Sequence, residues 1–177
     1  SEECKRLANM ALRIEHHWQA LYRGGFYRGG PILTSALSGI EQAMWDLLGK
    51  SLETPVYQLL GGAVRERVKV YAHVGGDTTE ELCTRSKALA TQGFSVLKTS
   101  FAPPVAYLEN QAFVESCTER FATLRNVVGP EVDLAIDFHG RFSPAMSKRM
   151  IRALEPYYPF FIEEPCLPGN TEALVEL

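Results

Sequence analysis

The chain has 177 residues, of which 46% are hydrophobic, and its 18 basic and 21 acidic residues give a formal charge of −3. This composition is typical of a folded globular chain and excludes a disordered or membrane-spanning one. The basic residues are scattered, so no basic stripe favours nucleic acid as a partner. No apolar run approaches the roughly 20 residues of a membrane-spanning helix, so we expect no membrane association.

Four cysteines, Cys4, Cys83, Cys117 and Cys166, are far apart in the sequence and form no metal-type pair. The sequence therefore predicts neither a disulfide framework nor a zinc site, and a reducing compartment fits best. The N-terminal sequence SEECKR lacks a signal-peptide core, so we expect a cytoplasmic protein. The first residue is not methionine, and residues 172–177 read as a helix cut off after it begins. We therefore expect missing sequence at both ends.

Residues 1–66 are predicted to be helical. Apolar residues recur every three or four positions over residues 7–21 and again from residue 34 to a stop at Gly49, which predicts two amphipathic helices. Residues 22–31 contain four glycines and a proline and are predicted to form a loop, which either closes over a site or packs against a helix. A short helical turn follows over residues 56–60.

From residue 67 onward, short apolar segments alternate with longer amphipathic ones. The pattern predicts helices at residues 78–92, 109–128 and 143–157, and strands at residues 68–74, 94–98, 132–136 and 160–162. Alternation of this kind indicates an α/β fold with a parallel sheet. Four such steps correspond to the first half of a TIM-type (β/α) barrel, which needs about 250 residues in full.

Acidic residues stand where the third and fourth predicted strands end, at Asp137 and Glu163. Because the carboxyl ends of neighbouring parallel strands meet at one edge of a sheet, we expect these two side chains to lie close together. A carboxylate pair suits Mg²⁺, which leaves its remaining positions to water or substrate oxygens. The alternative is that Asp137 begins a turn and Glu163 is a solvated charge.

Four more residues are predicted at the same edge. Lys98 is either a charge partner for a ligand or an acid, or a surface lysine without a task. His139 is predicted to transfer a proton, since Mg²⁺ prefers oxygen; metal ligation and an inert imidazole are the alternatives. Arg141 either holds a substrate carboxylate or hydroxyl or forms a salt bridge. His73, at the end of the first strand, ranks below His139 because it can equally be a packed barrel residue.

Two stretches, SGIEQAMWDLLGK at residues 38–50 and PVYQLLGG at residues 55–62, resemble the junction of capping domain and barrel in the mandelate racemase/muconate lactonizing enzyme subgroup of the enolase superfamily. The motifs DFHGR at residues 137–141 and FIEEP at residues 161–165 narrow the resemblance to the acid-sugar dehydratases of that subgroup. The implied architecture is the helical C-terminal part of an α+β capping domain over residues 1–66, followed by half a barrel over residues 67–177.

The resemblance implies a Mg²⁺-dependent dehydratase for a small-molecule sugar acid. It assigns Asp137 and Glu163 as metal ligands and His139 as the general acid that protonates the departing 3-hydroxyl, and it leaves Lys98 and Arg141 as candidates for substrate binding. The implied reaction converts D-galactonate to 2-keto-3-deoxygalactonate through an enediolate. A mannonate or gluconate dehydratase, or a truncated and non-catalytic fragment, are the alternatives.

The sequence departs from the family pattern in three ways. Racemases of the subgroup carry Lys-x-Lys on the second strand, whereas this chain has Lys98-Thr99-Ser100, which argues against racemisation. The third metal ligand and the histidine and aspartate of the expected base lie beyond Leu177. Two carboxylates alone bind Mg²⁺ weakly, so the chain by itself is a candidate for inactivity. The resemblance also implies a homo-oligomer for the full-length protein.

Overall fold

The computed structural model describes residues 12–101, 105–169 and 171–177. The chain divides into two compact units between Val68 and Lys69. No helix within the described ranges is both long enough and apolar enough to cross a membrane.

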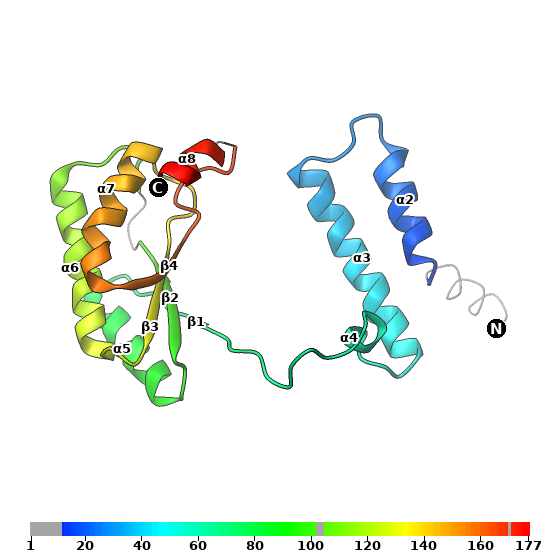
Figure 1. Cartoon of the computed structure of the whole chain (residues 1–177), viewed down its shortest axis with the longest axis horizontal. Helices are drawn as coiled ribbons and strands as arrows, with labels where there is room; N and C mark the ends of the chain where they lie inside the picture. Colours follow the sequence, from blue (N-terminus) through cyan, green and yellow to red (C-terminus); the bar gives the residue numbers. More distant parts are fainter. Residues whose placement is uncertain (1–11, 102–104, 170) are drawn as a thin grey trace. The chain divides into compact units, whose positions relative to one another are not determined.

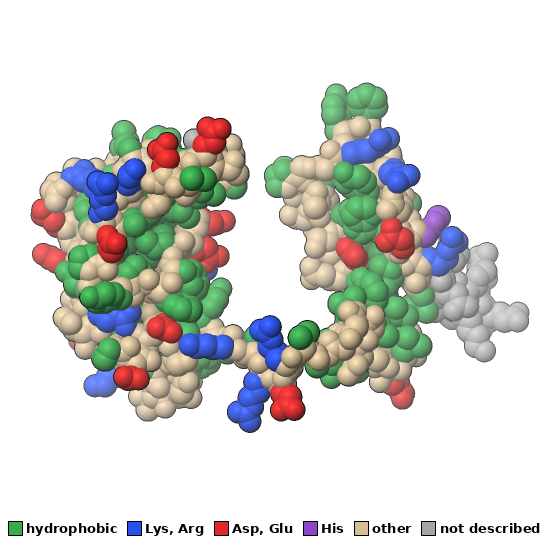
Figure 2. Space-filling model, viewed as in Figure 1, with side chains coloured by type: hydrophobic (Ala, Val, Ile, Leu, Met, Phe, Trp, Pro, Cys, Tyr) green, Lys and Arg blue, Asp and Glu red, His purple; other side chains and the backbone are tan. Residues whose placement is uncertain are grey.

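The first unit is a helical hairpin of α2 (Ile14–Gly24) and α3 (Pro31–Ser51), followed by the short helix α4 (Val56–Leu59) (Figure 1). The predicted helix over residues 7–21 is observed from Ile14 onward; its residues 7–11 lie outside the described residues. Apolar side chains are exposed around the turn of this hairpin (Figure 2), including Phe26, Tyr27 and Ile32, which are 91%, 84% and 83% exposed.

Both ends of α3 differ from the prediction. The helix begins at Pro31 rather than near residue 34, because a proline at the first helical position has a suitable fixed φ and lacks only an N–H that would be unpaired there. The helix also continues past Gly49 to Ser51. A Cβ at Gly49 would lie 2.8 Å from the backbone oxygen of Thr54, so this glycine allows the returning chain to approach closely and does not end the helix.

The second unit is a four-stranded parallel sheet in the order β1-β2-β3-β4. Its strands are β1 (Ala72–His73), β2 (Val96–Ser100), β3 (Asp133–Asp137) and β4 (Pro159–Glu163). The helices α5 (Thr79–Thr91), α6 (Gln111–Val128) and α7 (Pro144–Leu154) connect successive strands (Figure 1), and η1 (Glu155–Tyr157) and α8 (Thr171–Glu176) complete the unit. The predicted α/β fold with the first four strands of a barrel is confirmed.

The core of this unit lies between the sheet and its helices. The side chains of two paired strand residues, Leu97 on β2 and Leu134 on β3, are fully buried against helix residues that include Leu82, Leu124 and Met150. Because successive side chains of a strand point to opposite faces, the residue after Leu97 faces away from the helices. The alternation therefore directs Lys98 and Ser100 of β2, and Asp137 of β3, to the other face of the sheet, whereas Thr99 lies on the helix side with Leu97.

The first two strands also differ from the prediction. Of the predicted strand at residues 68–74, Ala72 and His73 pair with β2 as β1, and the N–H of Val74 donates to the oxygen of Lys98 at 2.8 Å. The strand predicted at residues 94–98 is observed at Val96–Ser100 and so continues two residues past Lys98. It begins later than predicted because the N–H of Phe94 donates to the oxygen of Leu89 at 3.2 Å and so completes the last turn of α5. The observed boundaries of β3 and β4 each differ from the predicted boundaries by one residue.

Candidate active site

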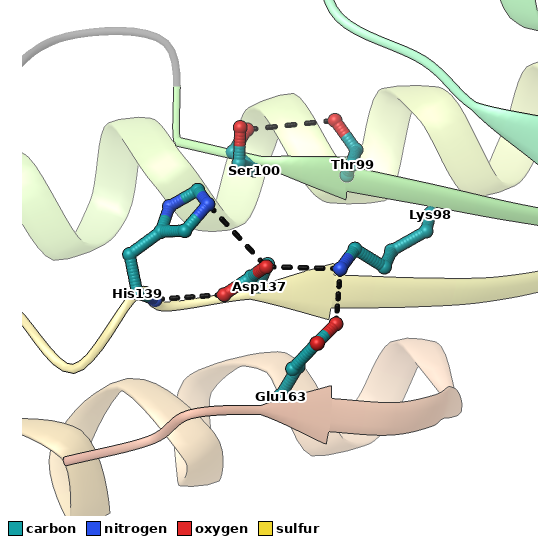
Figure 3. A network of polar contacts seen from close by, with 6 residues as sticks. All are labelled: Lys98, Thr99, Ser100, Asp137, His139 and Glu163. Atoms are coloured by element: carbon teal, nitrogen blue, oxygen red, sulfur yellow. Dashed lines mark hydrogen bonds and ion pairs between the residues drawn. The ribbon is translucent and has the colours of Figure 1, made fainter. Parts of the chain in front are cut away.

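The ends of three neighbouring strands bring one lysine, two carboxylates and one histidine together (Figure 3). Asp137 is paired with Ser100 of β2 on one side and with Glu163 of β4 on the other. Lys98 precedes Ser100 by two residues, so both residues face the same side of the sheet. The structure thus places Lys98, Asp137 and Glu163, predicted as one group from the strand pattern, within contact distance of one another.

Lys98 is buried between the two acids. Its Nζ donates to Oδ2 of Asp137 at 2.9 Å and also to Oε2 of Glu163, and its side chain is 9% exposed. The hydrogen bond with Glu163 raises the pKa of Lys98 well above its usual range; burial opposes this shift, and Asp137 adds to it. Lys98 is therefore a charged ammonium inside the site, and the interpretation as a surface lysine is wrong.

Asp137 uses both of its carboxylate oxygens. Oδ1 accepts the backbone N–H of His139 at 2.8 Å, while Oδ2 contacts Lys98 and lies 3.3 Å from Nε2 of His139. Burial on its own raises the pKa of this carboxyl, but the hydrogen bonds and charges of Lys98 and His139 together lower it below its usual value. The group is therefore an anion at neutral pH.

His139 stands at the mouth of the site on the loop that leaves β3. Its backbone is left-handed, with φ of 54°, a conformation that histidine adopts more readily than most residues. The preceding Phe138 is fully buried against Phe101 and Phe142, and the following Gly140 donates its N–H to the oxygen of Glu164 at 2.8 Å. These contacts fix the loop on both sides of an imidazole that remains 45% exposed.

Two other predicted residues lie less centrally. The side chain of Arg141 is exposed and forms no ion pair with any residue in the described ranges, so its role in substrate binding stays a prediction. His73 is paired with Lys98 in the ladder, which places both on the same face, and it is also exposed. The role of His73 stays a prediction.

One residue of the site was not identified from the sequence. The ring of Tyr71 has its centroid 5.6 Å from Nζ of Lys98, and it makes an edge contact with Phe161 at 6.1 Å. Tyr71 lies just before β1 and two residues before His73, and its contacts with Lys98 and Phe161 place its ring on the same side as the site. That spacing was the available signal, but an aromatic residue on a predicted strand is usually assigned to packing.

The donor set is compatible with part of a magnesium site. Asp137 and Glu163 offer hard oxygen ligands from adjacent strand ends, and both already converge on a single cationic group, Lys98. The described residues contain no cluster of three or more His, Cys, Asp or Glu side chains arranged to hold a metal ion. The two carboxylates therefore fit Mg²⁺ as an incomplete set, with other positions left to water or substrate oxygens.

Family comparisons agree with this arrangement. Residues 6–61 match the mandelate racemase/muconate lactonizing enzyme N-terminal domain, and residues 81–177 match the enolase C-terminal domain-like family. The chain belongs to the mandelate racemase/muconate lactonizing enzyme group of the enolase superfamily. The resemblance found in the motifs is thus confirmed.

Individual relatives of this enolase-superfamily chain are considerably longer. It is 48% identical over 165 residues to a D-galactonate dehydratase of Ralstonia nicotianae and 46% identical over 160 residues to one of Pectobacterium atrosepticum. These alignments cover 93% and 90% of this chain but only 43% and 42% of the two relatives. The chain therefore spans less than half the length of these curated relatives.

Solved structures show the same relationship. A mandelate racemase/muconate lactonizing enzyme-like protein from Rubrobacter xylanophilus superposes with a TM-score of 0.83 at 34% identity, covering 94% of this chain and 49% of that one. An enolase from Pantoea ananatis, solved with bound D-gluconate and Mg, superposes with a TM-score of 0.76 at 32% identity, covering 94% and 48%. The half-barrel with its preceding helices is thus shared with larger proteins of the superfamily.

Proposed function

We propose that this chain is the part of a Mg²⁺-dependent sugar-acid dehydratase that carries two metal ligands and the general acid. The observation that carries the proposal is the convergence of Lys98, Asp137, Glu163 and His139 at three adjacent strand ends. Identities of 48% and 46% to D-galactonate dehydratases support the reaction class. D-Galactonate is the first substrate to test.

In the proposed reaction, an aldonic acid loses its C2 proton and its 3-hydroxyl. His139 would give a proton to the departing hydroxyl, which leaves as water, and the resulting enol would tautomerise to a 2-keto-3-deoxy acid. The position of His139 supports this role, because its imidazole is exposed at the mouth while its backbone is fixed by Asp137 and the neighbouring loop. Among the described residues we assign no base for the C2 proton.

Asp137 and Glu163 would hold the Mg²⁺ ion. When bound, such an ion stabilises negative charge that develops on a substrate carboxylate during proton abstraction. Lys98 adds a second positive charge at the same place and would attract the acid group of the substrate. Arg141, exposed on the loop just beyond His139, is the candidate for contacting the more distant hydroxyls.

One further substrate has specific support. The Pantoea ananatis structure, 32% identical to this chain, contains D-gluconate and Mg. Galactonate and gluconate differ in the configuration of one hydroxyl, which lies away from the carboxylate and C2. The cluster of Lys98, Asp137 and Glu163 would contact only the acid end, so it does not discriminate between the two sugars.

The test measures formation of a 2-keto-3-deoxy acid from galactonate, gluconate and mannonate in the presence of Mg²⁺. The full-length gene product and the 177-residue chain are assayed in parallel, each with His139→Asn. Asparagine tolerates the left-handed backbone at this position, so the substitution removes the imidazole with little added strain. His16→Asn, on the exposed part of α2, is the matched control.

We expect the full-length protein to turn over galactonate. His139→Asn should lower this turnover about 10²- to 10⁴-fold, and His16→Asn should leave it unchanged. If the protein turns over gluconate faster than galactonate, the proposed substrate changes and the proposed reaction class stays the same. If the full-length protein dehydrates none of the three acids, the dehydratase proposal is wrong. Inactivity of the 177-residue chain alone, beside an active full-length protein, would show that this part is not sufficient for turnover.

A further inference from the structure

Lys98 already contacts the carboxylates that the proposed function gives to the metal. Its ammonium contacts Oδ2 of Asp137 at 2.9 Å and Oε2 of Glu163, and only 9% of its side chain is exposed (Figure 3). The other oxygen of Asp137 accepts the backbone N–H of His139. The ammonium thus contacts one oxygen of each acid.

A divalent cation on these oxygens would stand within a few ångströms of the lysine charge. Mg²⁺ binds carboxylate oxygens at about 2.0–2.1 Å, so the ion and the ammonium compete for the same acceptor positions. Like charges at such distances repel strongly in a partly buried site. Metal binding therefore requires that Lys98 give up at least part of its contact with Asp137 and Glu163.

The ring of Tyr71 offers the ammonium another partner. Its centroid lies 5.6 Å from Nζ, within the range of a cation–π interaction, and its edge contact with Phe161 restrains its orientation. The ring of Tyr71 lies on the same side as the site and makes its contact with Lys98 independently of the carboxylates. An ammonium that leaves the two acids can therefore remain inside the site.

We propose that Lys98 is an internal cation that competes with Mg²⁺ for Asp137 and Glu163, and that Tyr71 retains its ammonium when the metal displaces it. The inference rests on the metal site of the proposed function and adds a residue pair that sets its affinity. In this arrangement Lys98 keeps the two acids from repelling each other before the metal binds. The affinity for the metal is correspondingly lower than the carboxylates alone would give.

The experiment titrates Mn²⁺ into the full-length gene product and measures the free ion by EPR. Lys98→Met, which removes the charge and keeps most of the length of the side chain, is expected to bind Mn²⁺ about tenfold or more tightly than the wild type. Lys69→Met is the matched control, because Lys69 also pairs with an aspartate of β3, Asp133 at 3.4 Å, but is 62% exposed; its affinity should not change. Lys98→Arg keeps the charge and should not tighten binding.

Tyr71 is tested in the same titration. Tyr71→Leu should weaken Mn²⁺ binding about two- to fivefold, because the displaced ammonium loses its second partner, whereas Tyr71→Phe keeps the ring and should bind like the wild type. This pair leaves Lys98 and both acids in place, so it tests the proposal even if Lys98→Met does not fold. Equal binding by Tyr71→Leu and Tyr71→Phe would remove the tyrosine from the proposal.

Further outcomes separate this inference from the proposed function. A Mn²⁺ affinity of Lys98→Met that is equal to or weaker than that of the wild type would overturn the competition and leave the metal site intact. Asp137→Asn should abolish binding in every background; binding that survives it would show that Mn²⁺ is held elsewhere and would overturn the inference. If no variant binds Mn²⁺, the inference fails together with the metal site, while sugar-acid turnover still decides the dehydratase proposal.

Discussion

Asp137 contacts both the backbone and the side chain of His139. Its Oδ1 accepts the backbone N–H of His139 at 2.8 Å, and its Oδ2 lies 3.3 Å from Nε2 of the same residue. A carboxylate assigned to a metal ion thus also orients the residue assigned to proton transfer. His139 makes both contacts from a left-handed backbone conformation, with φ of 54°. The two proposed roles are therefore coupled through one side chain.

This coupling predicts different effects for two substitutions of Asp137. Asp137→Asn retains an oxygen that accepts the N–H of His139, whereas Asp137→Ala removes the acceptor. We expect both to abolish Mg²⁺-dependent turnover, and we expect the alanine variant to lose about 1 kcal/mol more unfolding free energy. Urea denaturation of both variants measures the difference. Equal losses would show that the hydrogen bond to His139 contributes nothing to stability.

The lowered pKa of Asp137 predicts how stability depends on pH. A carboxyl whose folded pKa lies below its unfolded value of about 4 stabilises the fold above that pH, and the contribution is lost as pH falls through the folded pKa. The stability advantage of wild type over Asp137→Asn should therefore be constant above about pH 5 and shrink below about pH 4. Denaturation in EDTA at a series of pH values measures it.

The control for this pH series is Asp133→Asn, which removes an exposed acid from the other end of the same strand. It separates the loss of any negative charge from the loss of the buried one. Curves for wild type and Asp137→Asn that stay parallel from pH 7 to pH 2 would contradict the assignment of Asp137 as a strongly stabilised anion.

Cys117 is predicted to be unreactive in the folded protein. Burial among α6 and its neighbours raises the pKa of this thiol to about 11, although the nearby Arg120 opposes the shift. At pH 8 its thiolate fraction, and hence its rate of alkylation, should be lower than that of an ordinary cysteine by a factor on the order of 100. Peptide mass spectrometry after timed iodoacetamide treatment measures the rate.

Unfolding provides the control for this labelling. In urea, Cys117 should react at the rate of the other cysteines of the chain, because its environment is lost. Native labelling as fast as labelling in urea would show that α6 opens readily or that the thiol is not buried. The described cysteines Cys83, Cys117 and Cys166 are all free, so disulfide formation does not complicate the comparison.

The sequence predicted the half-barrel and the meeting of Asp137 with Glu163 because both follow from strand alternation. Because Leu97 and Leu134 face the helices, Lys98 and Asp137 face the other side of the sheet. Parallel pairing then aligns the strand ends. No knowledge of individual contacts is needed for this result.

Contacts that depend on side-chain direction or tertiary approach were not predictable in the same way. The contact of Tyr71 with Lys98 depends on the register between β1 and β2, and most of the predicted first strand does not pair at all. Gly49 was interpreted as a helix stop because glycine commonly ends helices, whereas its role is to admit the backbone at Thr54. Arg141 and the metal assignment stay predictions, because neither depends on backbone pattern.

Gly140 is predicted to be necessary for the loop that carries His139. Its φ is +61°, a left-handed conformation that costs most residues other than glycine about 1–2 kcal/mol. A Cβ at this position would also lie 3.3 Å from Cδ2 and 3.6 Å from Cα of Leu167, so the side chain of Leu167 would have to move. Gly140→Ala should lower the unfolding free energy by about 1–2 kcal/mol.

The same substitution should reduce turnover, because Gly140 donates its N–H to Glu164 and lies next to His139. Displacement of this loop would move the imidazole from the leaving hydroxyl, so we expect kcat to fall by more than KM changes. Gly169→Ala is the matched control, because nothing lies within 4 Å of a Cβ there and its φ is not left-handed. Adding Leu167→Ala to Gly140→Ala should restore part of the stability by relieving the contact, while the backbone strain remains. A double variant no more stable than Gly140→Ala alone would show that the cost lies in the backbone conformation and not in the approach of Leu167.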